Sequence, residues 1–245
     1  MSATTKRVVA EVTVRPFFTL ALAGAACCLA GGAQAANLLT NGGFEEGPAL
    51  NFGTYYRGPL TPTGWSALPG YTPPDILSSA YVQTGAGFAQ LLSAHGGNRY
   101  LDTNSASPTG GLYQDISGLT PGSLLTMSFW SGRWAQNSSG TLVASLMDGA
   151  TVLGSTTVTL PYAPGATSAT WTEYVVTAIA PTSGTVRVQF IGASGSTARG
   201  APALDDVSLT AAGAAVPEPQ AWALMILGFG LAGSALRGRP TAADA

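Results

Sequence analysis

The middle of the chain contains short apolar runs in which polar residues alternate with apolar ones, and most runs end at Gly, Pro, Asn or Ser. Val186, Val188 and Phe190 occupy alternate positions of one run, which is typical of a strand with one buried face. An Asp-Gly pair at 148–149 separates two runs and indicates a hairpin turn. We expect strands at 81–83, 89–92, 111–116, 124–130, 141–148, 151–160, 170–179, 185–191 and 203–210.

These runs predict a single all-β domain over residues 36–212. No stretch of a dozen residues within it combines a helical period with capping residues, and no long charged segment divides it. Gly and Pro, 32 and 16 of 245 residues, are too frequent for a helical bundle. We therefore expect an antiparallel β-sandwich of about nine strands, most simply a jelly roll.

The first 35 residues have the organisation of a secretory signal peptide. Basic residues precede an apolar run at 17–30, and Ala-Gln-Ala at 33–35 has the small-residue form of a cleavage site. The run is shorter than the roughly 20 residues that span a bilayer as a helix. We expect signal peptidase to remove residues 1–35 and the protein to be exported.

Cysteine and histidine are too scarce for several kinds of site. Cys27 and Cys28 are the only cysteines and His95 is the only histidine, which excludes sites built from two histidines or from separated cysteine ligands. Both cysteines lie inside the predicted signal peptide. A lipoprotein signal that uses Cys27 is an alternative, although the leucine expected three residues upstream is missing.

The C-terminal segment 213–245 has three successive parts. A Pro-Glu-Pro motif at 217–219 is followed by an uncharged apolar stretch at 221–236 and then by two arginines. As a helix the stretch covers about 24 Å, less than the roughly 30 Å hydrocarbon core of a bilayer, so it suits a transient span whose basic end stays in the cytoplasm. The residues of this segment that we expect to act in sorting are Pro217, Glu218, Pro219, Arg237 and Arg239.

This tail resembles the PEP-CTERM sorting signal of Gram-negative bacteria in the string PEPQAWALMILGFGLAG and in its terminal arginines. The resemblance implies recognition by an exosortase, cleavage near residues 217–219, and delivery across the inner membrane to the cell surface or to the exopolysaccharide matrix. Residues 240–245 extend past the usual basic end of the signal. A permanent C-terminal membrane anchor is the alternative.

A second resemblance covers most of residues 36–210. Five stretches are similar, in order, to the DUF642 group of galactose-binding-like domains: NLLTNGGFE at 37–45, GW at 64–65, GNRYLD at 97–102, GLYQDI at 111–116 and PALDDVSL at 202–209. This resemblance implies a jelly-roll β-sandwich that binds cell-wall or matrix polysaccharide and has no catalytic activity. The loop at 130–134 fits the family pattern less well.

Two pairs of acidic residues lie near the two ends of this domain, at 45–46 and 205–206. In the resembled family the first and last strands are neighbours, so that carboxylates from both chain ends can converge. Carboxylate oxygens suit calcium, and only one member of each pair faces inward because side chains alternate along a strand. We predict a structural calcium ion (Ca2+) held by Glu45 and Asp205, with exposed or capping carboxylates as the alternative.

Aromatic rings beside planar polar groups predict carbohydrate contact, because a ring covers the C–H face of a sugar while the polar groups bind its hydroxyls. Trp134 lies outside the alternating runs, next to Arg133 and Asn137, and this is the densest such cluster. Trp65 follows a Pro-rich loop and is the fourth predicted contact. Three further ring residues are interpreted as core or turn residues: Trp130, Trp171 and His95.

Charge and residue content argue against several functions. Only 9% of residues are charged, the net charge is −2 and Lys6 is the only lysine, which argues against nucleic-acid binding and phosphate-binding loops. No Gly-x-Ser-x-Gly motif accompanies His95, so acyl transfer is not expected. Glycoside hydrolysis needs only two carboxylates, for which Asp102, Asp115 and Glu173 are candidates. We expect the protein not to be an enzyme.

The sequence thus predicts an exported, non-catalytic sandwich that binds extracellular polysaccharide. A structural matrix or surface-layer protein without specific glycan binding is the main alternative, and a weak glycoside hydrolase is the third. The expected partners are signal peptidase, an exosortase-type enzyme, the polysaccharide and, transiently, the inner membrane.

Both processing steps can be measured from the mass of the mature protein. We expect protein recovered from the culture medium and envelope of its native host to begin near Ala36 and to end near residues 217–219, because both predicted signals are removed. Intact-mass spectrometry measures both ends. A tail retained in the membrane fraction would contradict the processing prediction and support a permanent anchor.

Overall fold

The computed structural model describes residues 36–81, 90–104, 109–136, 138–194 and 202–212, together with residues 226, 227 and 229. By its internal contacts the chain divides into a segment Met1–Gln34 and a unit Ala35–Ala245 that contains every described residue. The predicted signal peptide lies outside the described residues. Of the predicted apolar tail, the described residues are helical and exposed: Ile226, Leu227 and Phe229. No helix within the described ranges is long and apolar enough to span a membrane.

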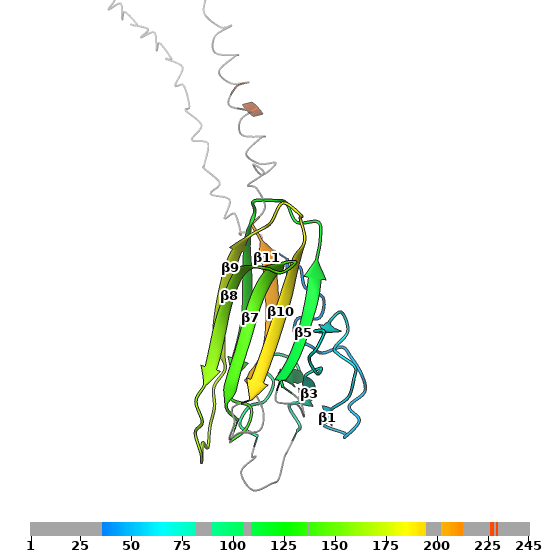
Figure 1. The fold of residues 1–245 in the computed structure, drawn as a ribbon, viewed down its shortest axis with the longest axis vertical. Helices are drawn as coiled ribbons and strands as arrows, with labels where there is room; N and C mark the ends of the chain where they lie inside the picture. Colours follow the sequence, from blue (N-terminus) through cyan, green and yellow to red (C-terminus); the bar gives the residue numbers. More distant parts are fainter. Residues whose placement is uncertain are drawn as a thin grey trace, which may run out of the picture. The chain divides into compact units, whose positions relative to one another are not determined.

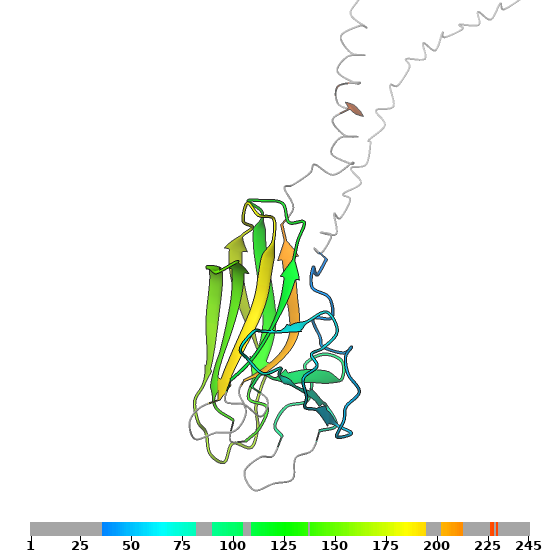
Figure 2. The ribbon, with the colours of Figure 1, turned by 45° about the vertical axis from the view of Figure 1, so that its right-hand side comes forward.

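The described domain is built from two antiparallel sheets. The strands of sheet A are β1 (Tyr55–Tyr56), β3 (Asp75–Ser78), β4 (Arg99–Asp102), β6 (Leu124–Gly132), β9 (Thr172–Ile179) and β11 (Ala203–Ala211). The strands of sheet B are β2 (Ser66–Ala67), β5 (Thr109–Ile116), β7 (Gly140–Asp148), β8 (Thr151–Leu160) and β10 (Val186–Ser194). Sheet A has the order β1-β3-β4-β11-β6-β9 and sheet B the order β2-β5-β10-β7-β8. The sheets face each other (Figure 1, Figure 2), which confirms the predicted all-β sandwich.

Apolar side chains from both sheets fill the space between them. In β10, Val186, Val188 and Phe190 are fully buried and the residues between them are not, as the alternation predicts. The Phe190 ring meets the Phe129 ring of β6 edge to face, with centroids 5.3 Å apart. Trp65, immediately before β2, packs against Phe190 with centroids 6.2 Å apart. The contact between Phe190 and Phe129 joins sheet B to sheet A, and Trp65 extends the same cluster of rings.

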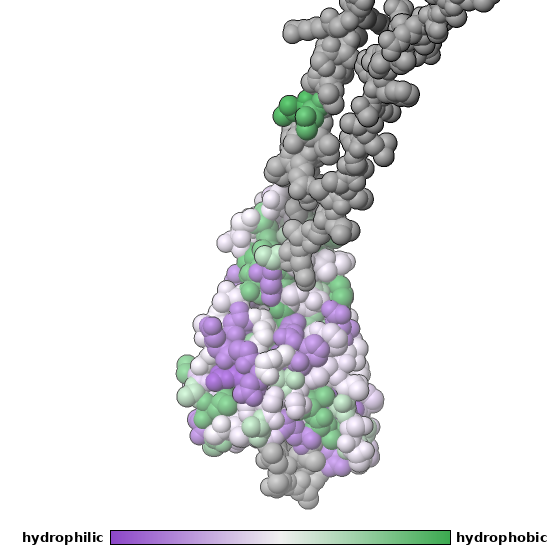
Figure 3. Space-filling model, turned by 180° about the vertical axis from the view of Figure 1, so that it is seen from behind, coloured by the Kyte–Doolittle hydropathy of each residue, from purple (hydrophilic) through white to green (hydrophobic). Residues whose placement is uncertain are grey.

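A second, smaller core lies on the outer face of sheet A. Because side chains alternate along a strand, Ile76 and Leu101 enter the main core, whereas their neighbours Leu77 and Tyr100 belong to the second cluster. Its other buried members are Leu92, Trp134, Ala135 and Ala203. Part of this outer face is therefore covered by a further layer of chain. Figure 3, which views the molecule from behind, shows hydrophilic side chains gathered on this side between smaller hydrophobic patches.

The two ends of the described domain are fixed to neighbouring strands of sheet A. Leu38 N–H donates to Leu209 O at 2.8 Å, and Asn37 Oδ1 accepts the N–H of Leu209 at 2.9 Å. Just beyond β11, Ala212 N–H donates to Leu124 O at 2.8 Å. The first described segment therefore runs beside the last strand.

Seven of the nine predicted runs are strands, namely those that became β5 to β11. The predicted hairpin turn is present, because β7 ends at Asp148, Gly149 has a φ of 57° and β8 begins at Thr151. The strands β1 to β4 were not predicted, since segments of two to four residues show no alternation. Of the two other runs, residues 82–89 lie outside the described residues, and Gln90 forms only an isolated bridge.

The ring contacts of Phe190 predict a large effect of its removal. Phe190→Ala should lower the free energy of unfolding by about 3–5 kcal/mol, because it leaves a cavity between the sheets. Tyr162→Ala is the control, since its side chain is exposed, and it should change stability by less than about 0.5 kcal/mol. Urea unfolding measures both. Equal effects of the two substitutions would show that the Phe190 ring does not join the sheets.

Candidate functional site

A bulge in β11 places a carboxylate beneath a loop. The bulge follows Asp205, and Asp206 has a positive φ of 45°. Asp205 is fully buried. Its Oδ2 accepts hydrogen bonds from the N–H groups of His95 (2.7 Å) and Gly96 (3.3 Å), and its Oδ1 accepts the N–H of Asp206 (2.8 Å). The carboxylate therefore holds the loop at 95–98 against the outer face of sheet A.

Glu45 fixes the same loop from the other end of the domain. Its Oε1 accepts hydrogen bonds from the N–H groups of Asn98 and Arg99, both at 2.8 Å. Gly97, with a φ of 59°, lies so close that a Cβ there would collide with this carboxylate. Carboxylates from both chain ends thus converge on one loop, as the sequence suggested for Glu45 and Asp205.

Hard carboxylate oxygens are the ligands that calcium prefers, yet these oxygens already accept backbone N–H groups. Among the residues that the structure describes, no group of three or more His, Cys, Asp or Glu side chains is placed to share an ion. The calcium ion expected at Glu45 and Asp205 therefore stays a prediction.

The surroundings of Asp205 change its acidity. Burial raises the pKa of this carboxyl group to about 7, and the nearby charge of Asp206 contributes to the rise, while the backbone N–H donors oppose it. The group is therefore partly protonated near neutral pH.

We call the contacts of Asp205 and Glu45 with the loop at 95–98 the junction. An aromatic cluster lies above the junction. The His95 ring stacks on Trp130, with centroids 3.8 Å apart and planes 17° apart, and Trp171 meets it edge on at 6.1 Å. His95 Nδ1 lies 2.7 Å from Asp206 Oδ2, and these side chains are 30% and 35% exposed. Trp130 and Trp171 are half-buried. We call His95, Trp130, Trp171 and Asp206 the His95 cluster.

The predicted ligand-binding cluster has structural contacts instead. Trp134 is only 5% exposed and lies in the second core. Arg133 Nη1 donates to Ser138 O, and its Nη2 donates to Pro161 O at 2.5 Å, so its guanidinium ties two loops together. Burial lowers the pKa of Arg133. Asn137 lies outside the described residues.

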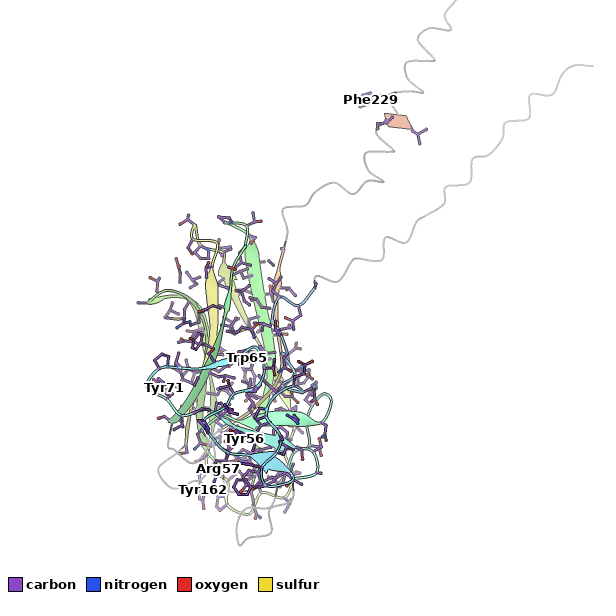
Figure 4. The ribbon with its side chains drawn as sticks, turned by 90° about the vertical axis from the view of Figure 1, so that its right-hand side faces the viewer. Tyr56, Arg57, Trp65, Tyr71, Tyr162 and Phe229 are labelled. Carbon is purple, nitrogen blue, oxygen red and sulfur yellow. The ribbon has the colours of Figure 1, made fainter. Side chains whose placement is uncertain are left out.

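Trp65 is also a core residue. Its ring is 4% exposed and lies within the sandwich (Figure 4), and its Nε1 donates to Asn41 O at 3.1 Å. A ring in this position has no face on which a sugar can stack. The predicted sorting residues lie outside the described residues: Pro217, Glu218, Pro219, Arg237 and Arg239.

The sequence interpretation missed the His95 cluster. Trp130 follows the buried Phe129 in β6, so strict alternation would have placed its ring on the outer face of the sheet. His95 gave no such signal, because its partner Asp206 is 111 positions away in the sequence.

No protein-family model and no curated protein match this sequence. Among solved structures, a Stig cyclase from Fischerella sp. TAU is similar at 21% identity over 73% of this chain and 98% of that chain, with a TM-score of 0.48. An arabinose-bound α-L-arabinofuranosidase matches at 17% identity over 74% of this chain and 27% of that chain, with a TM-score of 0.43. A structure described as CBM4 matches at 17% identity over 71% and 99%, with a TM-score of 0.37. Likeness at this level transfers neither a substrate nor a reaction.

These matches correct one expectation from the sequence. The Stig cyclase and the arabinofuranosidase are enzymes, so the prediction that this protein is not an enzyme is withdrawn. Of the acidic candidates for hydrolysis, Asp102 lies in β4 of sheet A and Asp115 in β5 of sheet B, on different layers of the sandwich.

The raised pKa of Asp205 predicts a pH-dependent stability. In the unfolded chain this group titrates near pH 4 and in the folded chain near pH 7, so its favourable contribution is complete below about pH 4 and is lost as the pH rises to 7. Between these pH values the unfolding free energy of the wild type should fall by roughly 2–4 kcal/mol relative to Asp205→Asn. Urea unfolding in EDTA measures this, and parallel pH profiles would refute it.

Proposed function

We propose that this protein is exported and binds neutral glycans at the His95 cluster. The observation that supports the site is the stack of half-buried rings, Trp130 and Trp171 around His95, with a carboxylate at 2.7 Å from the imidazole. The rings reach the surface on the outer face of sheet A, and the junction below fixes them before any ligand binds. A preformed site of this kind loses little entropy on binding.

The chemistry of the cluster matches that of a sugar. Indole and imidazole rings offer apolar surface to the C–H face of a sugar, and carboxylate oxygens accept hydrogen bonds from its hydroxyls. Asp206 supplies one partly exposed carboxylate. Glu173 supplies a second, because it lies opposite Trp130 in the β6–β9 register and is exposed.

The same face continues with hydroxyl groups rather than charges. Ser128 Oγ and Ser208 Oγ lie 2.9 Å apart on neighbouring strands, and Thr210 Oγ1 donates to Thr126 O at 3.4 Å. An uncharged hydroxyl surface favours a neutral ligand over a polyanion. The proposed ligand is therefore a neutral cell-surface or matrix polysaccharide.

Export and sorting belong to the same proposal. The apolar run at 17–30 and the Pro-Glu-Pro tail support removal of a signal peptide, exosortase processing near residues 217–219, and release at the cell surface or into the matrix. A jelly-roll domain of the galactose-binding-like type would then meet its glycan outside the inner membrane.

Glycan-array binding of the wild type and three variants tests the site. We expect Trp130→Ala and Trp171→Ala each to weaken binding by about tenfold or more, because each removes a ring from the cluster. Tyr162→Ala is the matched control, since its exposed ring lies outside the cluster, and it should keep the wild-type affinity.

Circular dichroism establishes that the variants are folded. Saturable binding that survives both tryptophan substitutions would contradict the proposed site. Absence of binding together with concentration-dependent self-association would favour the structural matrix alternative. Release of reducing sugar during the assay would show that the glycan is also hydrolysed.

A further inference from the structure

A hollow of about 330 Å³ lies on the outer face of sheet B, on the other side of the sandwich from the His95 cluster. It is lined by Asp115, Met147, Asp148, Gly149, Thr185 and Arg187. These residues come from the adjacent strands β5, β10 and β7 (Figure 1) and from the turns at their ends. None of them belongs to the site described above.

The strand register brings the lining side chains together. Val186 and Val188 fill the core, so Arg187 between them points away from it. Arg187 lies opposite Asp115 on one neighbouring strand and opposite Met147 on the other. The three outward side chains therefore form one row across three strands.

The Arg187 guanidinium is held in one orientation. Its Nε and Nη2 donate to the two carboxylate oxygens of Asp115 at 2.7 and 2.9 Å, and its carbon lies 3.8 Å from the centroid of the Tyr113 ring. A guanidinium has five N–H groups, of which this ion pair engages two. The other N–H groups are thereby fixed as donors in a defined plane.

Asp148 lines the hollow at the turn between β7 and β8. Its Oδ1 accepts the hydroxyl of Ser183 at 3.0 Å, which restrains the carboxylate and leaves a second oxygen to accept from a ligand. Gly149, with a φ of 57°, completes the tight turn. Met147 adds an apolar wall to this polar lining.

We propose that this hollow binds one neutral sugar residue. Fixed N–H donors and carboxylate acceptors suit hydroxyl groups that both accept and donate, and the apolar wall suits a C–H face. Two carboxylates against one guanidinium give the hollow a net negative charge, which disfavours an anion. The volume lies at the lower end of small-molecule sites, so it suits a single residue rather than a long chain.

A second site changes what the domain does with a glycan. This step rests on the proposed function, because it combines the hollow with the His95 cluster. With sites on both outer faces, one domain links two glycan chains, and binding to a dense matrix gains from the two contacts acting together.

Methyl NMR on the full-length protein, labelled with carbon-13 at the methionine methyl groups, tests the hollow directly. The probes are glucose, galactose, mannose and N-acetylglucosamine at millimolar concentrations. We expect at least one sugar to shift the Met147 signal saturably. Met127 is the internal control, since it is fully buried in the main core, and its signal should stay in place. Met147→Leu assigns the signal.

Substitutions at each site separate the hollow from the His95 cluster. Arg187→Gln should abolish the Met147 response or weaken it at least tenfold, with an unchanged Met127 signal as evidence of folding, and Asp148→Asn provides a second variant if Arg187→Gln does not fold. Trp130→Ala should leave the Met147 response intact.

The proposal is overturned if none of the four sugars shifts the Met147 signal. A lost Met147 response with intact array binding removes the second site and leaves the proposed function standing. A Met147 response without glycan binding at the His95 cluster removes the proposed function of that cluster and leaves the hollow as a sugar site.

Discussion

The buried carboxylate of Asp205 is the contact on which the outer side of sheet A depends. A carboxylate removed from water is costly unless hydrogen-bond donors surround it. Here the N–H groups of His95 and Gly96 come from a loop about 110 positions earlier in the sequence, and a third N–H comes from the adjacent Asp206. The same contacts set the height and orientation of His95 above Trp130. One buried acid therefore couples the closing strand of the sandwich to the arrangement of the surface aromatic rings, and Glu45 reinforces this from the opposite end of the domain.

The two outer faces of the sandwich use different devices to hold polar groups in place. On sheet A the rings are supported from below by a junction of carboxylates and backbone N–H groups. On sheet B the guanidinium of Arg187 is fixed from the side, by Asp115 and by the Tyr113 ring. Both arrangements order their groups before a ligand arrives, which suits a protein that has few long charged side chains to rearrange.

Local pattern was sufficient for the long strands and insufficient for the site. The alternation around Val188 and the Asp-Gly pair at 148–149 are decided by near neighbours, and both were predicted. Trp134 breaks the alternation, which made it look exposed, but distant segments cover it in the second core. His95 resembled an ordinary turn residue because its partners lie far along the chain. Contacts between distant segments decided these cases, and a single sequence read by itself carries no record of them.

The position of β11 also determines how the domain bears mechanical load. β11 lies inside sheet A, paired with β4 on one side and β6 on the other, and the chain leaves it at Ala212. A pull on the tail at Ala212 acts along this strand and loads its hydrogen bonds together in shear, whereas an edge strand peeled from its end would lose them one at a time. A protein attached through its C-terminal segment while its outer faces hold glycan would thus load the hydrogen bonds of β11 together rather than one at a time.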